Sequence, residues 1–295
     1  MTALDVAVVV IHHRRFPAVL ETLHDIVAAQ VPTSRLVVVD NSENEETATA
    51  LEASAEGWHV VTVSNKGYGA AANTGVQHVA DSDLVLVLTH EVRIDAASVA
   101  ALIRTIAEDP SVAAAGPGLV VTDRNAVWSR GGALSRHLLL PRQIRSEQVG
   151  LPRVNDVDWL DGACVAYRTS DLLVAPFRED FFLYFEETEL HTRLRRAGRR
   201  VVTVGDATAY QSSAGMPAYL GCRNYIVFLA AHGSRPALLV GPWIFLVRAM
   251  VASLAARRWG EILAAPRGLV AGYRSLRTRT AARPTAMSDT RGPRP

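Results

Sequence analysis

Cysteine and lysine are scarce in this sequence of 295 residues, which contains two cysteines, Cys164 and Cys222, and a single lysine, Lys66. Two cysteines without metal-ligand spacing provide neither a disulfide framework nor a cysteine-based zinc site. Such usage is typical of a reducing, cytoplasmic compartment. The first residues, MTALDVAVVVIHHRR, lack the basic start and the long apolar run of a secretory signal. With 49% hydrophobic and 20% charged residues, the composition is that of a globular protein.

Charge is nearly balanced overall, at +2, but it is unevenly distributed. From Arg248 onward there are ten arginines against two acidic residues, Glu261 and Asp289. A block of charges of one sign is typical of a tail or a contact surface. The C-terminal part is therefore expected to have a role of its own.

Apolar, β-branched runs alternate with helical patterns over the first 110 residues. The expected strands cover residues 6–12, 35–41, 59–65 and 83–91, and the expected helices cover 17–30, 46–56, 69–80 and 95–109. Continuous apolar runs indicate strands buried on both faces. The alternation predicts an α/β fold with a mostly parallel, Rossmann-like central sheet and helices on both faces.

The pattern loosens from residue 112 to residue 180, where shorter and partly antiparallel strands are expected. Residues 201–211 read as a last strand. Helices are expected after it, and the polar, proline-containing residues 277–295 are expected to be disordered.

Polar side chains follow each expected parallel strand, where ligands bind in such sheets. His12, Asp40, Asn65 and the triplet Thr89-His90-Glu91 stand at these ends. The run GYGAAA fits the loose pattern Gly-x-Gly-x-x-Ala, but a dinucleotide fingerprint belongs in the first strand–helix turn, which here is HHRRFP. This argues against a Rossmann dehydrogenase. We expect these glycines to let the backbone approach a nucleotide at the third strand.

The order of five segments resembles the inverting family 2 glycosyltransferases, and within them the rhamnosyltransferase-like branch. The segments are VVVDNSENEE, NKGYGAAANTGV, GACVAYRTSDL, FFLYFEETELHTRLRRAG and RNYIVFL. The resemblance implies a GT-A fold over residues 1–230, with a nucleotide-binding half (1–110) and an acceptor half (111–230). It also implies transfer of a sugar from a dTDP- or UDP-linked donor to an acceptor hydroxyl, usually with Mg²⁺ or Mn²⁺.

Several residues match the family's nucleotide-sugar site. The resemblance places Asp40 at the nucleotide base. Asn65, Gly67 and Asn73 lie along the nucleotide, and Arg223 lies near the diphosphate. Lys66 is a candidate to neutralise the diphosphate, and His12 stands at the same edge of the sheet. The resemblance and the preceding segment give Trp159, Asp161, Gly162 and Ala163 as the wall of the donor and acceptor pocket.

The catalytic base is expected in FFLYFEETEL. The resemblance implies that Glu187 takes the proton of the acceptor hydroxyl, with Glu186 as the alternative, because the family's aspartates are glutamates here. Inversion by one displacement needs a base on one face and stabilisation of the leaving diphosphate on the other. The four aromatic residues of the segment are expected to give a low-dielectric surround that raises a carboxyl pKa.

The metal site departs from the family pattern. Glu91, with His90 beside it, stands where the family usually has an aspartate, and Tyr210 or Gln211 stands where it often has a histidine. A carboxylate oxygen suits a hard divalent cation. We expect Mg²⁺ or Mn²⁺ at Glu91 and His90, with altered or weakened use of the metal as the alternative.

The segment 231–276 alternates apolar patches with arginines and is expected to form amphipathic helices. Its longest uncharged run, Pro236 to Val247, falls short of the ~20 residues of a membrane span. Three roles stay open for these helices: binding to an anionic membrane surface, covering the domain or forming a homodimer contact, and spanning the membrane. The expected location is cytoplasmic, with a peripheral position on the inner face of the membrane as the alternative. The expected partners are a nucleoside diphosphate sugar and a glycan, lipid-linked or small-molecule acceptor, with no nucleic acid.

Two other functions stay open at this point. Because the metal positions depart from the family pattern, a non-catalytic nucleotide-sugar-binding protein would bind nucleotides without transfer. A sugar nucleotidyltransferase would release pyrophosphate instead of a nucleoside diphosphate.

Overall fold

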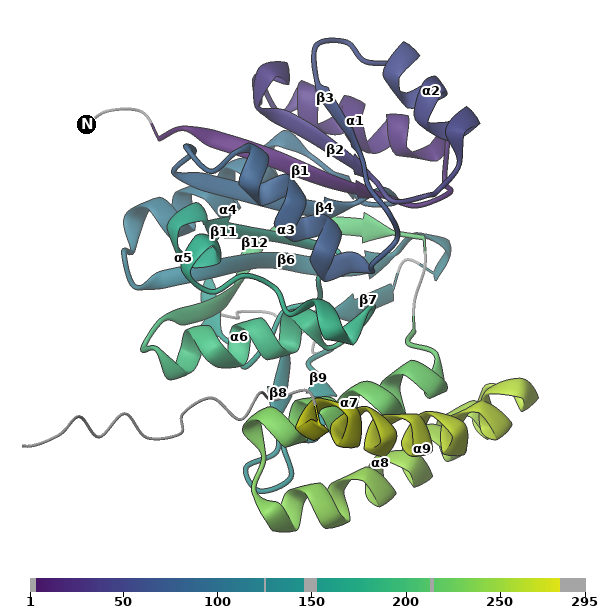
Figure 1. Ribbon diagram of the computed structural model, residues 1–295. Coiled ribbons are helices and arrows are strands. Elements are labelled where there is room, and N and C mark those ends of the chain that lie inside the picture. Colours follow the sequence, from purple (N-terminus) through teal and green to yellow (C-terminus); the bar gives the residue numbers. More distant parts are fainter. Residues whose placement is uncertain (1–3, 125, 146–152, 213–214, 282–295) are drawn as a thin grey trace, which may run out of the picture. The chain divides into compact units, whose positions relative to one another are not determined.

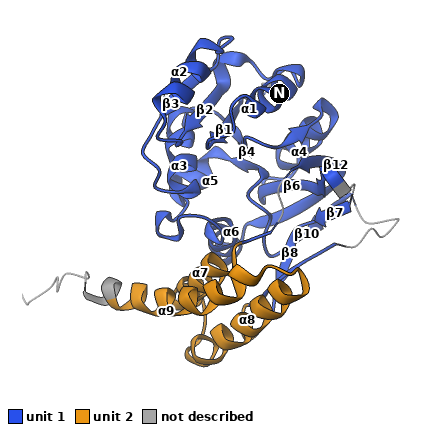
Figure 2. Ribbon diagram, turned by 90° about the vertical axis from the view of Figure 1, so that its right-hand side faces the viewer, with its two compact units in different colours: residues 1–136, 140–216 blue, residues 137–139, 217–295 orange. Residues whose placement is uncertain are grey.

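The computed structural model describes residues 4–124, 126–145, 153–212 and 215–281. The chain divides into two compact units (Figure 2). The first comprises residues 1–136 and 140–216, and the second comprises residues 137–139 and 217–295. The first unit has a mixed α/β fold, and the elements described in the second are helices.

Strands and helices alternate in the first half of the α/β unit, as the sequence pattern predicts (Figure 1). The elements are β1 (Val6–His12), α1 (Ala18–Ala28), β2 (Leu36–Asp40), α2 (Glu45–Ala53), β3 (His59–Thr62), α3 (Tyr68–His78), β4 (Leu84–Thr89), β5 (Arg93–Ile94) and α4 (Ala96–Glu108). The four long strands pair in parallel in the order β3-β2-β1-β4. This is the strand order of a nucleotide-binding half.

The second half widens the sheet with mixed strands. Its elements are β6 (Val112–Val121), β7 (Ala126–Ser129), β8 (Gly132–Leu134), β9 (Pro141–Gln143), β10 (Val154–Asp156), β11 (Cys164–Arg168), α5 (Thr169–Val174), α6 (Glu186–Arg196) and β12 (Arg200–Gln211), with 3₁₀ turns at Thr33–Arg35, Thr122–Arg124 and Glu179–Phe181. β11 runs antiparallel between β4 and β6, and β12 runs parallel to β6. β8 and β9 form a separate ribbon. The sheet is therefore parallel from β4 to β3 and mixed from β11 to β10.

Alternate residues of the central strands face two separate cores. In β1, Val8 and Val10 pack in a core with residues of α1 and α4, whereas Ala7 and Val9 pack in a core with residues of α3 and α6. α3 approaches β1 closely, since a Cβ built at Gly75 would lie 2.3 Å from a methyl carbon of Val9. The expectation of helices on both faces is confirmed (Figure 1).

The third strand ends three residues earlier than expected. The third strand was expected to reach residue 65, but β3 ends at Thr62, which pairs with Asp40, the last residue of β2. Beyond this pair the chain leaves the ladder: Val63 N donates to Asp40 O at 2.8 Å, and Asn65 N donates to the Glu43 carboxylate at 3.0 Å. A strand cannot continue where its neighbour has ended.

The second unit contains α7 (Ala218–His232), α8 (Arg235–Ala255) and α9 (Trp259–Ala281). They share a small apolar core that includes Cys222, Ile226, Leu246 and Leu269. Pro242 lies inside α8 and cannot donate to the carbonyl four residues earlier. The Tyr273 hydroxyl of α9 donates to that carbonyl, Leu238 O, at 3.0 Å, so the proline is accommodated by a tertiary hydrogen bond.

The expected domain boundary at residue 230 falls inside α7, and the division of function between 1–110 and 111–230 stays a prediction. The expected disorder of 277–295 concerns residues of which 282–295 lie outside the described part of the chain, while α9 extends to Ala281.

Candidate active site

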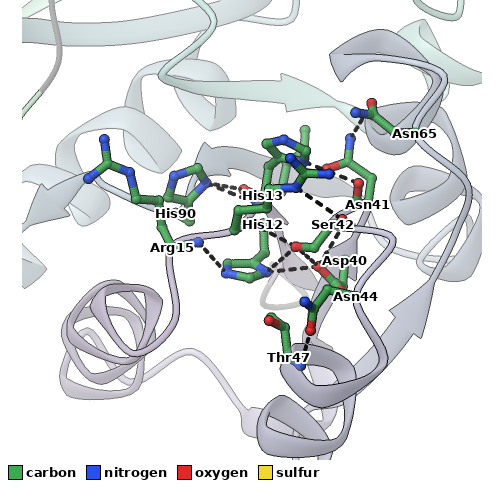
Figure 3. Close-up of polar contacts among 12 residues, drawn as sticks. His12, His13, Arg15, Asp40, Asn41, Ser42, Asn44, Thr47, Asn65 and His90 are labelled. Carbon is green, nitrogen blue, oxygen red and sulfur yellow. Dashed lines mark hydrogen bonds and ion pairs between the residues drawn. The ribbon is translucent and has the colours of Figure 1, made fainter.

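The carboxyl ends of β1, β2 and β4 bring three predicted residues together (Figure 3). His12 stands opposite Asp40 in the parallel register of β1 and β2. The backbone N–H of His90 donates to Ile11 O at 3.0 Å, which fixes the turn after β4 beside β1. The rings of His12 and His90 meet edge to face, with centroids 5.5 Å apart.

Asp40 is completely buried and is hydrogen-bonded through one oxygen. Its Oδ1 accepts from His12 Nδ1 at 2.8 Å, from the Ser42 hydroxyl at 2.5 Å and from Ser42 N at 3.1 Å. Burial acts to raise the pKa of Asp40, but these hydrogen bonds outweigh it and lower the pKa below its usual value. Asp40 Oδ2 is buried without a hydrogen-bond partner among the described residues. The Asp40 carboxylate is thus left with one oxygen free to accept from a donor that the described residues do not supply.

His12 has a defined tautomer. Its Nε2 accepts the backbone N–H of Arg15 at 3.1 Å, so the neutral ring carries its proton on Nδ1 and donates it to Asp40. The ring is fully buried. His12 therefore orients the Asp40 carboxylate and presents no free nitrogen of its own.

The loop after β3 joins this group through Asn65. Its Oδ1 accepts from Gly67 N at 3.2 Å and from Asn41 Nδ2 at 3.5 Å. Asn41 Oδ1 is a second buried acceptor without a partner among the described residues. Lys66 is exposed between Asn65 and Gly67.

Gly67 and Asn73 contact another part of the protein in a way the sequence did not reveal. Gly67 has φ +97°, and a Cβ built there would lie 1.9 Å from Phe182 O. The next residue, Tyr68, donates its N–H to the same carbonyl at 2.8 Å. Asn73 accepts from Phe177 N and donates to Phe177 O, both at 2.9 Å. These residues hold the segment 177–182 against α3, which is one reason for the glycine, and the expected approach of Gly67 to a nucleotide stays a prediction.

The segment that precedes α6 is strained. Phe182, Tyr184 and Phe185 have φ values of +69°, +69° and +75°. Bulky residues rarely adopt positive φ, and each such position costs about 1–3 kcal/mol and persists only where its surroundings impose it. Phe181 and Phe185 are buried, as expected for a low-dielectric surround, but Phe182 is exposed. Strain of this kind directly before two carboxylates is typical of a functional segment.

Glu186 and Glu187 occupy the first two positions of α6. Glu186 is 3% exposed, and its Oε2 has no hydrogen-bond partner among the described residues. Burial raises the pKa of Glu186 to about 7, against opposing hydrogen bonds from backbone N–H groups. Burial, together with repulsion from Glu186 and Asp161, also raises the pKa of Glu187. Glu187 is less buried than Glu186, so it is the more accessible of the two strong bases.

Glu189 has a different environment on the same helix. It is 1% exposed, and it accepts from Arg193 Nε at 2.9 Å while Arg178 lies 3.8 Å away. Glu189 and Arg193 thus form an i, i+4 ion pair within α6.

Sequence reasoning missed a buried pair behind the two glutamates. His191 lies one turn after Glu187 on α6, and its Nε2 is 3.0 Å from the Tyr167 hydroxyl of β11. His191 Nδ1 accepts the N–H of Leu160 at 3.1 Å, so the ring proton sits on Nε2 and is donated to Tyr167. Burial lowers the pKa of His191 to about 3, which keeps the ring neutral. Only the i, i+4 spacing of Glu187 and His191 could have pointed to this pair.

The expected pocket-wall residues lie on the chain leading into β11. Trp159 is buried with its ring against Gly132, where a Cβ would lie 2.1 Å from the ring. Gly162 O accepts from the Tyr68 hydroxyl at 2.6 Å, and Ala163 O accepts from Thr89 N at 3.0 Å. Burial raises the pKa of Asp161, whose Oδ2 has no partner among the described residues. These contacts join the ends of β4 and β11 to α3.

The expected metal ligands do not form a protein-only site. Within the described residues, no three histidine, cysteine, aspartate or glutamate side chains are grouped so that they could hold a metal ion. Glu91 accepts from the Ser212 hydroxyl at 2.8 Å, and His90 Nδ1 lies 3.2 Å from Ile11 O and 3.3 Å from His13 N. The donor set still fits Mg²⁺ or Mn²⁺, because such ions are often held by one carboxylate and substrate phosphates.

The last predicted residue, Arg223, belongs to α7 in the second unit, and its guanidinium donates to Asn224 Oδ1. Its expected role near the diphosphate stays a prediction.

Solved structures define the class of fold. GalNAc-T7, solved with UDP, GalNAc and Mn²⁺, aligns with a TM-score of 0.62 at 14% identity, over 78% of this chain and 48%, about half, of that one. A mannosyltransferase from Pyrobaculum calidifontis, solved with GDP-Man and Mn²⁺, aligns with a TM-score of 0.57 at 18% identity, over 96% of this chain and 76% of that one. S. aureus TarS 1–349 with UDP aligns with a TM-score of 0.54 at 18% identity, over 79% of this chain and 69% of that one. The protein has the GT-A fold.

Residues 3–223 match the family described as "Glycosyltransferase like family 2", and the chain belongs to this family. It is therefore a glycosyltransferase. A curated relative, the N-acetylglucosaminyl-diphospho-decaprenol L-rhamnosyltransferase of Mycobacterium tuberculosis (strain CDC 1551 / Oshkosh), is 27% identical over 249 residues, which are 75% of this chain and 77% of the relative. The family, the fold and the likeness to a rhamnosyltransferase, all expected from the motifs, are confirmed.

Proposed function

We propose that this glycosyltransferase moves a sugar from a dTDP- or UDP-linked donor to an acceptor hydroxyl with inversion, using Glu187 as the general base. The observation that carries the proposal is the buried pair of glutamates with raised pKa values at the start of α6. A carboxylate with a raised pKa is a stronger base near neutral pH. The segment that presents the pair is bonded to the loop that follows β3.

In the proposed reaction, Glu187 accepts the proton of the acceptor hydroxyl. The oxygen attacks the anomeric carbon as the bond from that carbon to the diphosphate oxygen breaks, and the nucleoside diphosphate leaves on the opposite face. Glu186 is the less accessible of the two, and its role is to keep the pKa of Glu187 high. His191 and Tyr167 fix the packing behind the pair.

We place the donor nucleotide at the end of β2. Asp40 Oδ2 and Asn41 Oδ1, both without protein partners in the described chain, accept hydrogen bonds from the N–H of the base. Asn65 and Lys66 follow along the nucleotide, with Lys66 as a cation for the diphosphate. Trp159, Asp161, Gly162 and Ala163 form the wall of the sugar pocket, and Arg223 is kept as a candidate phosphate ligand.

A divalent cation would be held by Glu91, with His90 Nε2 beside it, and by phosphate oxygens. When bound, it neutralises charge on the departing diphosphate. The two Mn²⁺-containing structures support the choice of Mg²⁺ or Mn²⁺. For the acceptor we propose a lipid-linked glycan, following the name of the relative. The proposed site of action is cytoplasmic, as the cysteine usage suggests.

The test is transfer from dTDP- and UDP-sugars by the wild type, by Glu187→Gln and by a matched control, Glu52→Gln, which changes an exposed glutamate on α2. We expect Glu187→Gln to lose about 10²- to 10⁴-fold in turnover with a melting temperature no lower than that of the wild type, because it replaces a carboxyl whose pKa is raised by burial, and the control to lose nothing. NMR of the product reports the anomeric configuration. Full turnover by Glu187→Gln overturns the assignment of the base, and a retained configuration overturns the single displacement.

A further inference from the structure

Helix α8 carries an apolar surface that no described residue of its own unit covers. One side packs on α7 and α9, where Phe245 stacks on Tyr225 with ring centroids 4.7 Å apart. The other side exposes seven large apolar residues at helical spacing, which we call the α8 stripe. It consists of Leu239, Val240, Trp243, Ile244, Val247, Val251 and Leu254. Exposed apolar surface of this extent marks an interaction site.

The charge around the stripe has one sign. Within residues 217–281 there are nine arginines, and Glu261 is the single acidic residue. Glu261 is engaged with Ala218 N at 2.5 Å. Arg235 and Arg257–Arg258 stand just before and just after the stripe, and Arg248 lies within it; all are exposed. The α8 stripe is therefore an apolar strip in a basic surround, which complements an anionic, apolar surface.

A shallow hollow on α9 adds a second basic feature. It has a volume of about 280 Å³ and is lined by Pro266, Arg267, Val270 and Arg274. Tyr273, next to Arg274, is hydrogen-bonded to Leu238, next to the first residue of the stripe. The hollow therefore lies on a helix bonded to the start of α8, and its two guanidinium groups suit a phosphate.

We propose that the α8 stripe docks on an anionic lipid bilayer, with α8 lying in the plane of the interface. Apolar side chains enter the acyl boundary and the arginines contact lipid phosphates. α8 is long and apolar enough to cross a membrane, and 28% of its most apolar stretch is buried. Crossing the bilayer would take it away from the Tyr225 ring and the Tyr273 hydroxyl that hold it. A second copy would bring Arg248 against arginines of the same sign, so a bilayer fits the surface better.

The test is co-sedimentation of the full chain with vesicles of phosphatidylcholine alone and with 30% phosphatidylglycerol added. We compare the wild type with the double variant Val247→Glu/Val251→Glu, both positions being 60% exposed, and with Val174→Glu, which is 88% exposed on α5. We expect the wild type to bind the anionic vesicles only. The double variant should bind them at least about ten-fold more weakly, and Val174→Glu should bind them as the wild type does. Binding should weaken at high salt, because the arginine contacts are screened.

Further measurements test whether the variants stay folded and whether a second copy or a membrane span accounts for the exposed stripe. Melting curves should show that the double variant stays folded. Trp243→Phe should remove a blue shift of tryptophan emission that vesicles cause in the wild type. Equal vesicle binding by the wild type and the double variant overturns the proposal. A wild-type dimer in light scattering that is absent in the double variant also overturns it, because the stripe is then a contact between two copies. Release from membranes by detergent but not by alkaline carbonate overturns it as well, because α8 then spans the bilayer.

Discussion

Replacing Glu186 by glutamine tests the electrostatics of the site without reference to any substrate. Glu186 has a folded-state pKa of about 7, against an ordinary value of 4.5. The folded state therefore binds the proton more tightly than the unfolded state. The contribution of Glu186 to the free energy of unfolding is fully present below pH 4.5 and is lost as the pH rises toward 7. Between these values the unfolded chain releases the proton freely, whereas the folded protein must keep the carboxyl protonated or bury its charge. At 1.36 kcal/mol per pKa unit, the wild type loses roughly 2–3 kcal/mol between pH 5 and pH 8 through this residue.

Glu186→Gln removes this loss, so its stability relative to the wild type should rise by that amount between pH 5 and pH 8. For a unit of roughly 210 residues the melting temperature should shift by about 4–12 °C. The assay is urea or thermal unfolding at both pH values. The matched control is Glu189→Gln, equally buried but paired with Arg193, which should destabilise at both pH values. Parallel pH–stability curves for the wild type and Glu186→Gln would refute the reasoning.

Three further outcomes follow from the same contacts. Removing the charge of Glu186 lowers the pKa of Glu187, so the acid limb of the pH–rate profile of Glu186→Gln should move to lower pH, which steady-state rates from pH 5 to pH 9 will show. Gly67→Ala should destabilise by several kcal/mol in urea unfolding, because its Cβ would overlap Phe182 O at positive φ, whereas Gly260→Ala, with open space around it, should not. Asn73→Ala should cost about 2–4 kcal/mol, since it leaves both backbone groups of Phe177 unpaired, and limited proteolysis should find the 177–182 segment more accessible.

The parallel half of the fold could be predicted from the sequence because its signals are local. Each strand is a continuous apolar run, each helix has its own period, and the expected ends differ from those observed by three residues or fewer. The polar strand ends follow from the same rule, since parallel strands end at one edge of the sheet. His12, Asp40 and His90 meet there for that reason.

Contacts between distant segments could not be predicted in this way. Nothing near Ser212 in the sequence points to Glu91, and nothing near Tyr167 points to His191. The positive φ values before α6 also escape a reading of residue types, because aromatic side chains do not signal a left-handed backbone. The same holds for α8, where apolar residues occur all round the helix and only packing decides which half is exposed.

The loop after β3 and the segment before α6 are best understood as one structural piece. Asn73 and Phe177 are 104 residues apart in the sequence, yet they exchange two hydrogen bonds, and Gly67 and Tyr68 meet the Phe182 carbonyl. This attachment helps to hold the strained backbone at Phe182, Tyr184 and Phe185. A nucleotide bound along Asn65 to Gly67, as we propose, would therefore act on the support of Glu186 and Glu187. That link gives a physical reason why the glycine motif and the acidic motif occur in the same chain.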